Sequence, residues 1–152
     1  MKIIRGLHNL TSQHFGCVAT IGNFDGVHLG HVEILKRLII KSAHYKVPSV
    51  VILFEPQPAE FFRYGRIPAR LSRLSEKAQL IFACGVDKVL VLRFSRNLAS
   101  YSPQQFVEEI LVKRMGIKSL IIGDDFRFGT DRGGDFSLLS SLATKHQFSL
   151  DQ

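Results

Sequence analysis

The sequence predicts an α/β protein built on a Rossmann-like, doubly wound parallel sheet. Short apolar runs alternate with amphipathic helical patterns along the 152 residues. Successive residues in these runs are apolar, so each strand is apolar on both of its faces. This is expected for strands of a parallel sheet that helices cover on both sides. Right-handed crossovers between such strands give the doubly wound arrangement.

The predicted elements form four strand–helix pairs. In chain order, the pairs are strand 18–24 with helix 29–45, strand 50–54 with helix 72–84, strand 89–92 with helix 103–115, and strand 120–122 with helix 136–146. Residues 148–152 resemble the beginning of another strand, at the point where the sequence stops. We therefore expect residues 1–152 to be one domain, truncated at its C-terminus and belonging to a longer protein.

Capping signals support the predicted helix boundaries. Ser102 can cap the third helix, Pro103 suits its first position, Gln105 can complete a capping box, and Gly116 follows as a stop. The other helices carry signals of the same kinds: Ser72 or Ser75 and Gly85 for the second helix, and Asp135 for the fourth.

Composition excludes several classes of protein. The longest apolar runs fall far short of the about 20 residues that cross a bilayer, and the N-terminus lacks the pattern of a secretory signal, so we expect a cytoplasmic location. Cys17 and Cys84 show no CxxC spacing and are expected to be reduced, buried thiols. The net charge of +7 favours anionic partners without distinguishing nucleic acid from nucleotide phosphates.

The segment 22–31, GNFDGVHLGH, joins the first predicted strand to its helix. In a doubly wound sheet this loop is the favoured phosphate site, because ligands bind at the carboxyl ends of the strands and a helix N-terminus attracts anions. His28 and His31, three residues apart, can donate hydrogen bonds to one phosphate chain. Three glycines allow tight turns and close approach of a ligand: Gly22, Gly26 and Gly30. The segment matches neither the Walker A pattern of P-loop proteins nor the GxGxxG pattern of dinucleotide-binding proteins.

Two other interpretations of the histidines remain open. Each histidine can be an ordinary structural residue, capping a loop or packing on a neighbour. The pair can also chelate a metal, although a third ligand is missing unless Asp25 turns inward.

Two further segments follow apolar strands and are expected at the same sheet edge. They are FEPQP at 54–58, with Phe62 shortly after it, and GDDFRFG at 123–129. Aromatic side chains with a few polar groups suit a large flat ring, although Phe54 and Phe62 can equally be core residues. Arg127 suits a phosphate contact.

With these three motifs in order, the sequence resembles the HxGH nucleotidyltransferases, and more closely the bacterial FAD synthetases, which are bifunctional riboflavin kinase/FMN adenylyltransferases. The resemblance implies the HUP-type fold and transfer of AMP from ATP to FMN, with Mg²⁺ on the triphosphate. It assigns His28 and His31 to catalysis. It assigns to ATP the residues Gly22, Asn23, Phe24, Asp25, Gly26, His28, Gly30, His31, Gly123 and Arg127. It assigns to FMN the residues Phe54, Gln57, Pro58, Phe62, Asp125 and Phe128.

The sequence departs from that family in two respects. The Ser-Ser-Thr-x-x-Arg segment that clamps the ATP phosphates is absent, and so is a C-terminal riboflavin kinase domain. We therefore expect residues 1–152 by themselves to have little or no activity. Two alternatives remain: another HxGH transferase, such as a cytidylyltransferase, and a non-catalytic module that binds nucleotide, flavin or nucleic acid. We expect small-molecule partners, with neither nucleic acid nor membrane, and the sequence leaves the oligomeric state open.

Overall fold

A computed structural model of the chain describes residues 1–24, 29–55, 74–123 and 134–152. Six strands form one sheet: β1 (Lys2–Arg5), β2 (Cys17–Ile21), β3 (Ser49–Phe54), β4 (Lys88–Leu92), β5 (Ile117–Ile121) and β6 (Ser149–Asp151). Every neighbouring pair of strands is parallel, and the order across the sheet is β1-β4-β3-β2-β5-β6. The predicted parallel sheet is confirmed.

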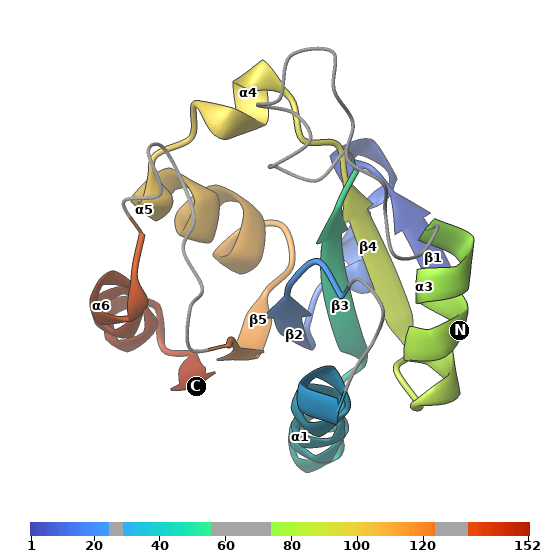
Figure 1. Cartoon of the computed structure of the whole chain (residues 1–152). Helices are drawn as coiled ribbons and strands as arrows, with labels where there is room; N and C mark the ends of the chain where they lie inside the picture. The colour runs from blue at the N-terminus through green and yellow to red at the C-terminus, as the bar shows by residue number, and fades with distance from the viewer. Residues whose placement is uncertain (25–28, 56–73, 124–133) are drawn as a thin grey trace.

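Helices cover both faces of this sheet (Figure 1). The helical elements are η1 (Leu7–Asn9), η2 (Ser12–His14), α1 (Leu29–Tyr45), α3 (Leu74–Ala83), α4 (Arg96–Ala99), α5 (Pro103–Gln105), η3 (Phe106–Val112) and α6 (Phe136–His146). α1 and α3 share one hydrophobic core with the sheet, while η3 and α6 share the other. The fold is therefore doubly wound, as predicted.

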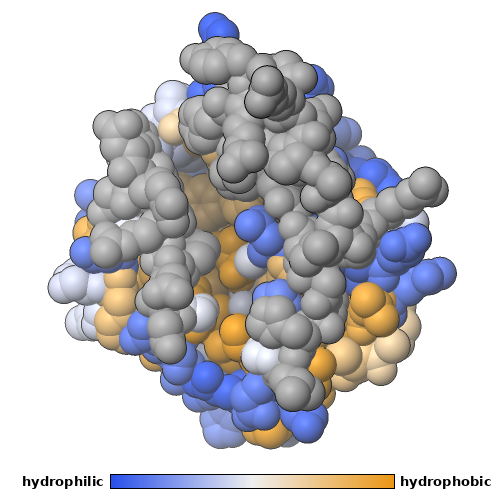
Figure 2. All heavy atoms as spheres, viewed as in Figure 1, coloured by the Kyte–Doolittle hydropathy of each residue, from blue (hydrophilic) through white to orange (hydrophobic). Residues whose placement is uncertain are grey.

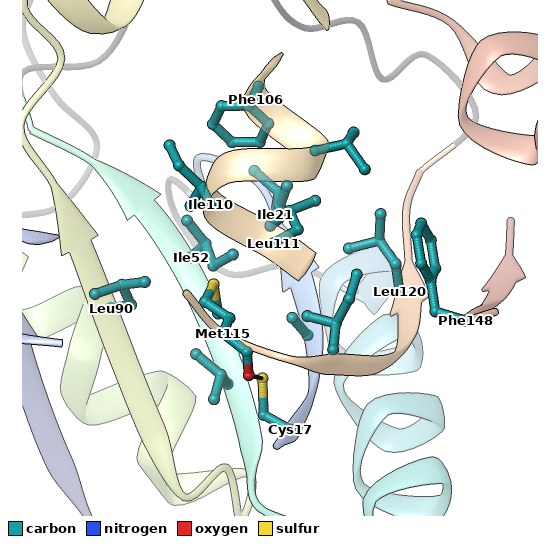
Figure 3. Close-up of a cluster of buried hydrophobic side chains, with 14 of the residues drawn as sticks. Cys17, Ile21, Ile52, Leu90, Phe106, Ile110, Leu111, Met115, Leu120 and Phe148 are labelled. Atoms are coloured by element: carbon teal, nitrogen blue, oxygen red, sulfur yellow. Dashed lines mark hydrogen bonds between the residues drawn. The ribbon is translucent and has the colours of Figure 1, made fainter. Parts of the chain in front are cut away.

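Alternation along each strand builds the two cores. On β3, Val50 and Ile52 belong to the cluster under η3 and α6, whereas Val51 and Leu53 belong to the cluster under α1 and α3. Figure 3 shows the first of these clusters, in which side chains from η3 pack across the strands. Because both faces are covered, β2 and β3 are buried at almost every position and are mostly apolar, which explains the apolar runs in the sequence.

The structure matches some predicted boundaries and corrects others. α1 and α6 span the predicted residues, and the predicted terminal strand exists as β6. β2 ends at Ile21 rather than at residue 24, and β5 begins earlier than predicted, at Ile117. β1 and α4 were not predicted. In β1 only Ile4 is buried, so this edge strand lacks the apolar run by which the others were recognised.

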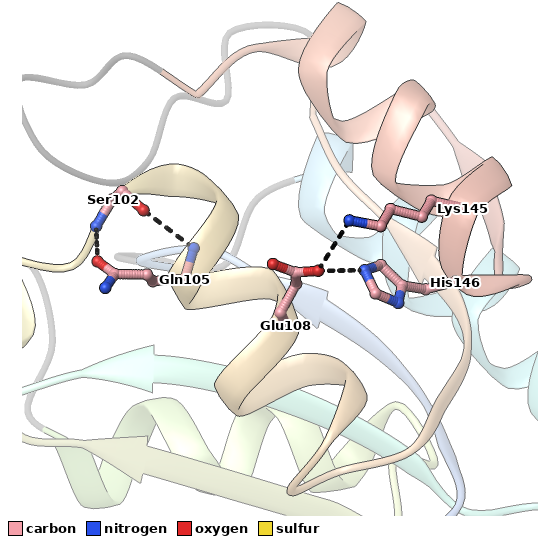
Figure 4. A network of polar contacts seen from close by, with 5 residues as sticks. All are labelled: Ser102, Gln105, Glu108, Lys145 and His146. Carbon is pink, nitrogen blue, oxygen red and sulfur yellow. Dashed lines mark hydrogen bonds and ion pairs between the residues drawn. The ribbon is translucent and has the colours of Figure 1, made fainter.

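Most of the predicted caps are present. Ser102 accepts a hydrogen bond from the Gln105 backbone N–H, and the Gln105 side chain accepts one from Ser102 N–H (Figure 4). Asp135 caps α6 by accepting from Leu138 N–H at 3.0 Å. Gly85 and Gly116 follow α3 and η3 at φ +101° and +60°. Ser75 as a cap was wrong because it lies inside α3, and Ser72 lies outside the described residues.

The third predicted helix changes its winding after the first turn. Residues 106–112 form a π-helix, in which the Lys113 N–H donates to the Glu108 carbonyl five residues earlier. Four of its residues are buried: Phe106, Val107, Ile110 and Leu111. The regular α-helix expected over 103–115 was therefore wrong in its interior. π-turns occur often near functional sites.

Both cysteines are free thiols, as predicted. Cys17 is buried at the start of β2, and burial raises its pKa to about 12, so this thiol stays protonated. Cys84 is only half-buried, because it lies in the turn after α3, and the prediction that it is buried was wrong. Among the described helices, none is both long and apolar enough to cross a membrane.

A polar cluster joins η3 to α6 (Figure 4). The Glu108 carboxylate lies 2.7 Å from the His146 Nε2 and 3.4 Å from the Lys145 Nζ. The hydrogen bond from Gln104, followed by those from His146 and Lys145 and by the Lys145 charge, lowers the pKa of Glu108, while desolvation opposes this shift.

This cluster predicts a pH dependence of stability. A lowered pKa in the folded state means that ionised Glu108 stabilises the fold above its ordinary value of 4.5, and that this contribution is lost as the pH falls through the folded pKa. The Tm of the wild type should exceed that of Glu108→Gln at neutral pH, and the difference should shrink in acid. Glu109→Gln is the matched control, because in the described part of the chain the more exposed Glu109 carboxylate forms an ion pair with Lys113 alone, at 3.8 Å. A difference that stays constant over the acid range contradicts the prediction.

Candidate active site at the carboxyl edge of the sheet

The strand order places a ligand site between β2 and β5. From β2 the chain moves outward through β3 and β4, and it then returns to the other side of β2 to add β5 and β6. The two directions of winding diverge at β2 and β5, and ligands in open α/β sheets bind at such a switch point, beyond the carboxyl ends of the strands. Thr20 pairs with Ile121, so Gly22 and Gly123 each follow two residues later at this edge.

Gly22 is required for space rather than for an unusual backbone angle. Its N–H donates to the Ile52 carbonyl at 3.3 Å, which continues the β2–β3 ladder. A Cβ at this position would lie 2.8 Å from Cε2 of Phe24. The ring of Phe24 therefore folds back over Gly22 at the end of β2.

Phe24 adopts a backbone conformation that bulky residues avoid. Its φ is +53°, and strain of this kind costs on the order of 1–3 kcal/mol. The side chain is 2% exposed and belongs to the core under α1 and α3. The ring is thus buried in the core, so the expected contact of Phe24 with ATP stays a prediction for its backbone. Asn23, next to it, is exposed.

His31 lies in the first turn of α1, where the N-terminal end of the helix favours an anion. The imidazole is half-buried, and its centroid is 4.8 Å from that of the Phe24 ring, with the planes inclined by 42°. Gly30 is a helical residue of α1, so its predicted role in a tight turn was wrong.

Three predicted residues of the same loop lie outside the described residues: Asp25, Gly26 and His28. The pairing of His28 with His31 therefore stays a prediction. Within the described segments, no group of three or more metal-ligating side chains is present.

An aromatic cluster forms where β3 ends. Phe54 packs edge-on against Phe94 with centroids 5.7 Å apart, and it lies 6.4 Å from Phe106 of η3. Phe54 is half-buried against the core under η3 and α6, so it combines a packing role with some exposure. Phe94 and Phe106 were not predicted as neighbours of the site, since neither lies in a motif. The other predicted flavin contacts lie outside the described residues: Gln57, Pro58, Phe62, Asp125 and Phe128.

The end of β5 borders open space. A Cβ on Gly123 would meet no atom of the described structure within 4 Å, in contrast to Gly22. Figure 2 shows hydrophobic residues at the bottom of a hollow in the face viewed in Figure 1, between η3 and β3. Arg127, the predicted phosphate ligand, lies outside the described residues.

Two other groups with shifted pKa values, His14 and Cys17, lie at the opposite, amino edge of the sheet. His14 lies 3.1 Å from Lys88, at the start of β4, and its pKa is lowered by burial and by the charges of Lys88 and Lys2. Cys17 also stands at the amino end of its strand.

Comparisons with known proteins show which family the chain belongs to. The family model described as FAD synthetase matches residues 10–152. The chain belongs to the FAD synthetase family. The bifunctional riboflavin kinase/FMN adenylyltransferase of Escherichia coli strain K12 is 48% identical over 151 residues, and that of Pseudomonas fluorescens is 50% identical over 151 residues. Each match covers 99% of this chain and 48% of the relative, so the chain spans about half the length of these FAD synthetase relatives.

Among solved structures, a macrolide-efflux protein from Streptococcus pneumoniae superposes with a TM-score of 0.83 at 22% identity, covering 98% of this chain and 48% of that chain. At that identity the likeness supports the fold alone. The FAD synthetase fold predicted from the motifs is therefore supported by sequence and by shape.

The close contact at Gly22 predicts a specific loss of stability. Gly22→Ala should lower the free energy of unfolding by about 1–3 kcal/mol, because the added Cβ overlaps a ring that the core holds in place. Thermal unfolding measures the change, and Gly123→Ala is the matched control because its Cβ would meet no described atom within 4 Å. Equal Tm values for the two variants would show that the Phe24 ring moves aside freely.

Proposed function

We propose that this chain carries the FMN adenylyltransferase activity of its family, which transfers AMP from ATP to FMN and yields FAD and pyrophosphate. The observation that carries the proposal is the convergence of the motif-bearing strand ends at the switch point of the sheet, in a chain that matches the FAD synthetase family. The natural relatives are also named riboflavin kinases, and we extend the proposal to that second activity in the full-length protein.

The reaction requires positioning and charge neutralisation more than covalent help from the protein. A phosphate oxygen of FMN attacks the α-phosphorus of ATP, and the bond from that phosphorus to the bridging oxygen breaks. Pyrophosphate leaves with the bonding electrons. The protein's contribution is to hold the two nucleotides in line and to stabilise the charge that develops on the leaving oxygens. In the proposal Mg²⁺ enters with the triphosphate.

The histidine loop is proposed to bind the triphosphate. His31 stands at the positive end of α1, where a donor and the helix dipole act on the same anion. His28 is proposed to act on the same phosphates. The exposed Asn23 is proposed to contact a phosphate or ribose oxygen. Gly123 is also proposed to border the nucleotide, since a Cβ there would meet no described atom within 4 Å, and Arg127 is proposed as its phosphate ligand.

The flavin is proposed to occupy the apolar side of the same edge. The half-buried rings of Phe54 and Phe94 pack edge-on where β3 ends, and Phe54 also packs near the buried Phe106. An isoalloxazine ring is large, flat and partly apolar, and such surfaces favour it. The remaining proposed FMN contacts are Gln57, Pro58, Phe62, Asp125 and Phe128.

The proposal is tested by removing one histidine. His31→Gln in the natural full-length polypeptide should lower kcat for FAD formation by roughly 10²–10³-fold, the usual cost of losing one donor to a developing charge. Chromatography of the flavins after incubation with MgATP and FMN measures the rate. His44→Gln is the matched control, because His44 is exposed in the last turn of the same helix.

Two outcomes of this assay would reject the proposed activity. The first is no FAD formation by the wild type, and the second is transfer of CMP from CTP in preference to AMP. A wild-type rate of FAD formation in the His31→Gln variant would instead reject the proposed role of His31. Residues 1–152 assayed alone should give little or no pyrophosphate, and robust turnover by them would show that the Ser-Ser-Thr-x-x-Arg segment is dispensable.

A further inference from the structure

The conformation of Phe24 is unusual for its residue type. Among the described residues, the non-glycine residues at positive φ are Phe24, Lys46 and Gln147. Lys46 and Gln147 follow the last turns of α1 and α6, where a left-handed residue commonly ends a helix. Phe24 instead lies between β2 and α1. It does not follow the last turn of a described helix, so helix termination does not account for its conformation. Strain at such a residue persists only where its surroundings hold it, and it concentrates at functional sites.

The strained backbone sends the Phe24 ring into a narrow space between two parts of the predicted phosphate loop. On one side the ring lies so close to Gly22 that a Cβ there would be 2.8 Å from Cε2. On another side it meets the imidazole of His31 at 4.8 Å, inclined by 42°. The ring is 2% exposed and is held by the core that α1 and α3 share with the sheet. It therefore connects the end of β2 to the first turn of α1.

We infer that Phe24 is a positioning residue, whose ring fixes the imidazole of His31 in the orientation needed to donate to the triphosphate. The inference rests on the proposed function and adds a residue whose ring packs against the proposed catalytic histidine. The buried ring touches none of the reacting atoms. A tilted aromatic pair at this distance favours one arrangement of the two rings. A restrained imidazole loses less conformational entropy when it binds phosphate. More of the free energy of its hydrogen bond to phosphate is then available to lower the activation barrier.

A purely structural role for Phe24 predicts a different result. If the ring only fills space, its loss should reduce stability in the same way as any other cavity in that core, without a selective effect on turnover. Ile81 of α3 provides this comparison, since it belongs to the same cluster and is fully buried.

The experiment compares Phe24→Leu with Ile81→Ala in the natural full-length polypeptide. Leucine retains an apolar side chain but offers no ring face to His31. We expect Phe24→Leu to lower kcat for FAD formation by roughly 10–100-fold, with the KM for FMN little changed. Ile81→Ala should lower the Tm but keep the wild-type kcat at temperatures where it is folded. If Phe24→Leu does not fold, Phe24→Met replaces it, because methionine adapts to irregular cores.

The second readout is the NMR signal of the His31 ring, assigned with His31→Gln. Aromatic ring currents displace the resonances of protons close to the Phe24 ring, so these resonances should move in Phe24→Leu, while those of His44 stay in place. Unmoved His31 resonances, or equal losses of kcat in Phe24→Leu and Ile81→Ala, would overturn the inference. Absence of FAD formation by the wild type would reject the proposed function, and the NMR comparison would still show whether the Phe24 ring lies against the His31 ring.

Discussion

The parallel pairing of β2 with both β3 and β5 determines where this molecule can act. Parallel neighbours need crossover connections, so the carboxyl ends of all the strands open at one edge and the helices must return over the two faces. At the switch point the chain continues from β2 to β3 on one side and from β5 to β6 on the other. Gly22 and Gly123 follow these adjacent strands at the same edge, and His31 lies in the first turn of α1.

The two edges of the sheet are built differently. At the amino edge, the Asp87 carboxylate accepts hydrogen bonds from the Ser49 N–H and hydroxyl, at 2.9 and 3.1 Å, and the Ser49 hydroxyl accepts one from the Asp87 N–H. This reciprocal set joins the first residue of β3 to the residue before β4. At the carboxyl edge the contacts are aromatic: Phe24 packs against His31, and Phe54 against Phe94 and Phe106. Through these rings the carboxyl edge is connected to both cores.

Sequence reasoning succeeded where local signals and burial agreed. α1 and α6 matched because strong helical patterns and, for α6, the Asp135 cap define their ends. β1 was missed because an edge strand with one buried residue shows no apolar run. The π-helix was missed because the caps and the apolar pattern predict a helix without specifying whether its hydrogen bonds span four or five residues. The motif order predicts a site at the carboxyl edge, but the contact between Phe24 and His31 depends on a left-handed backbone angle that no residue pattern indicated.

Amide chemical-shift mapping tests the location of the site most directly. MgATP and FMN, added together to the isotopically labelled natural full-length polypeptide, should shift the backbone amides of Gly22, Asn23, Gly30, His31 and Gly123. The amides of Ser49, Asp87 and Lys88, at the amino edge, should remain in place. Perturbations concentrated at the amino edge, or none at the carboxyl edge with both nucleotides at saturating concentration, would contradict a nucleotide site at the switch point.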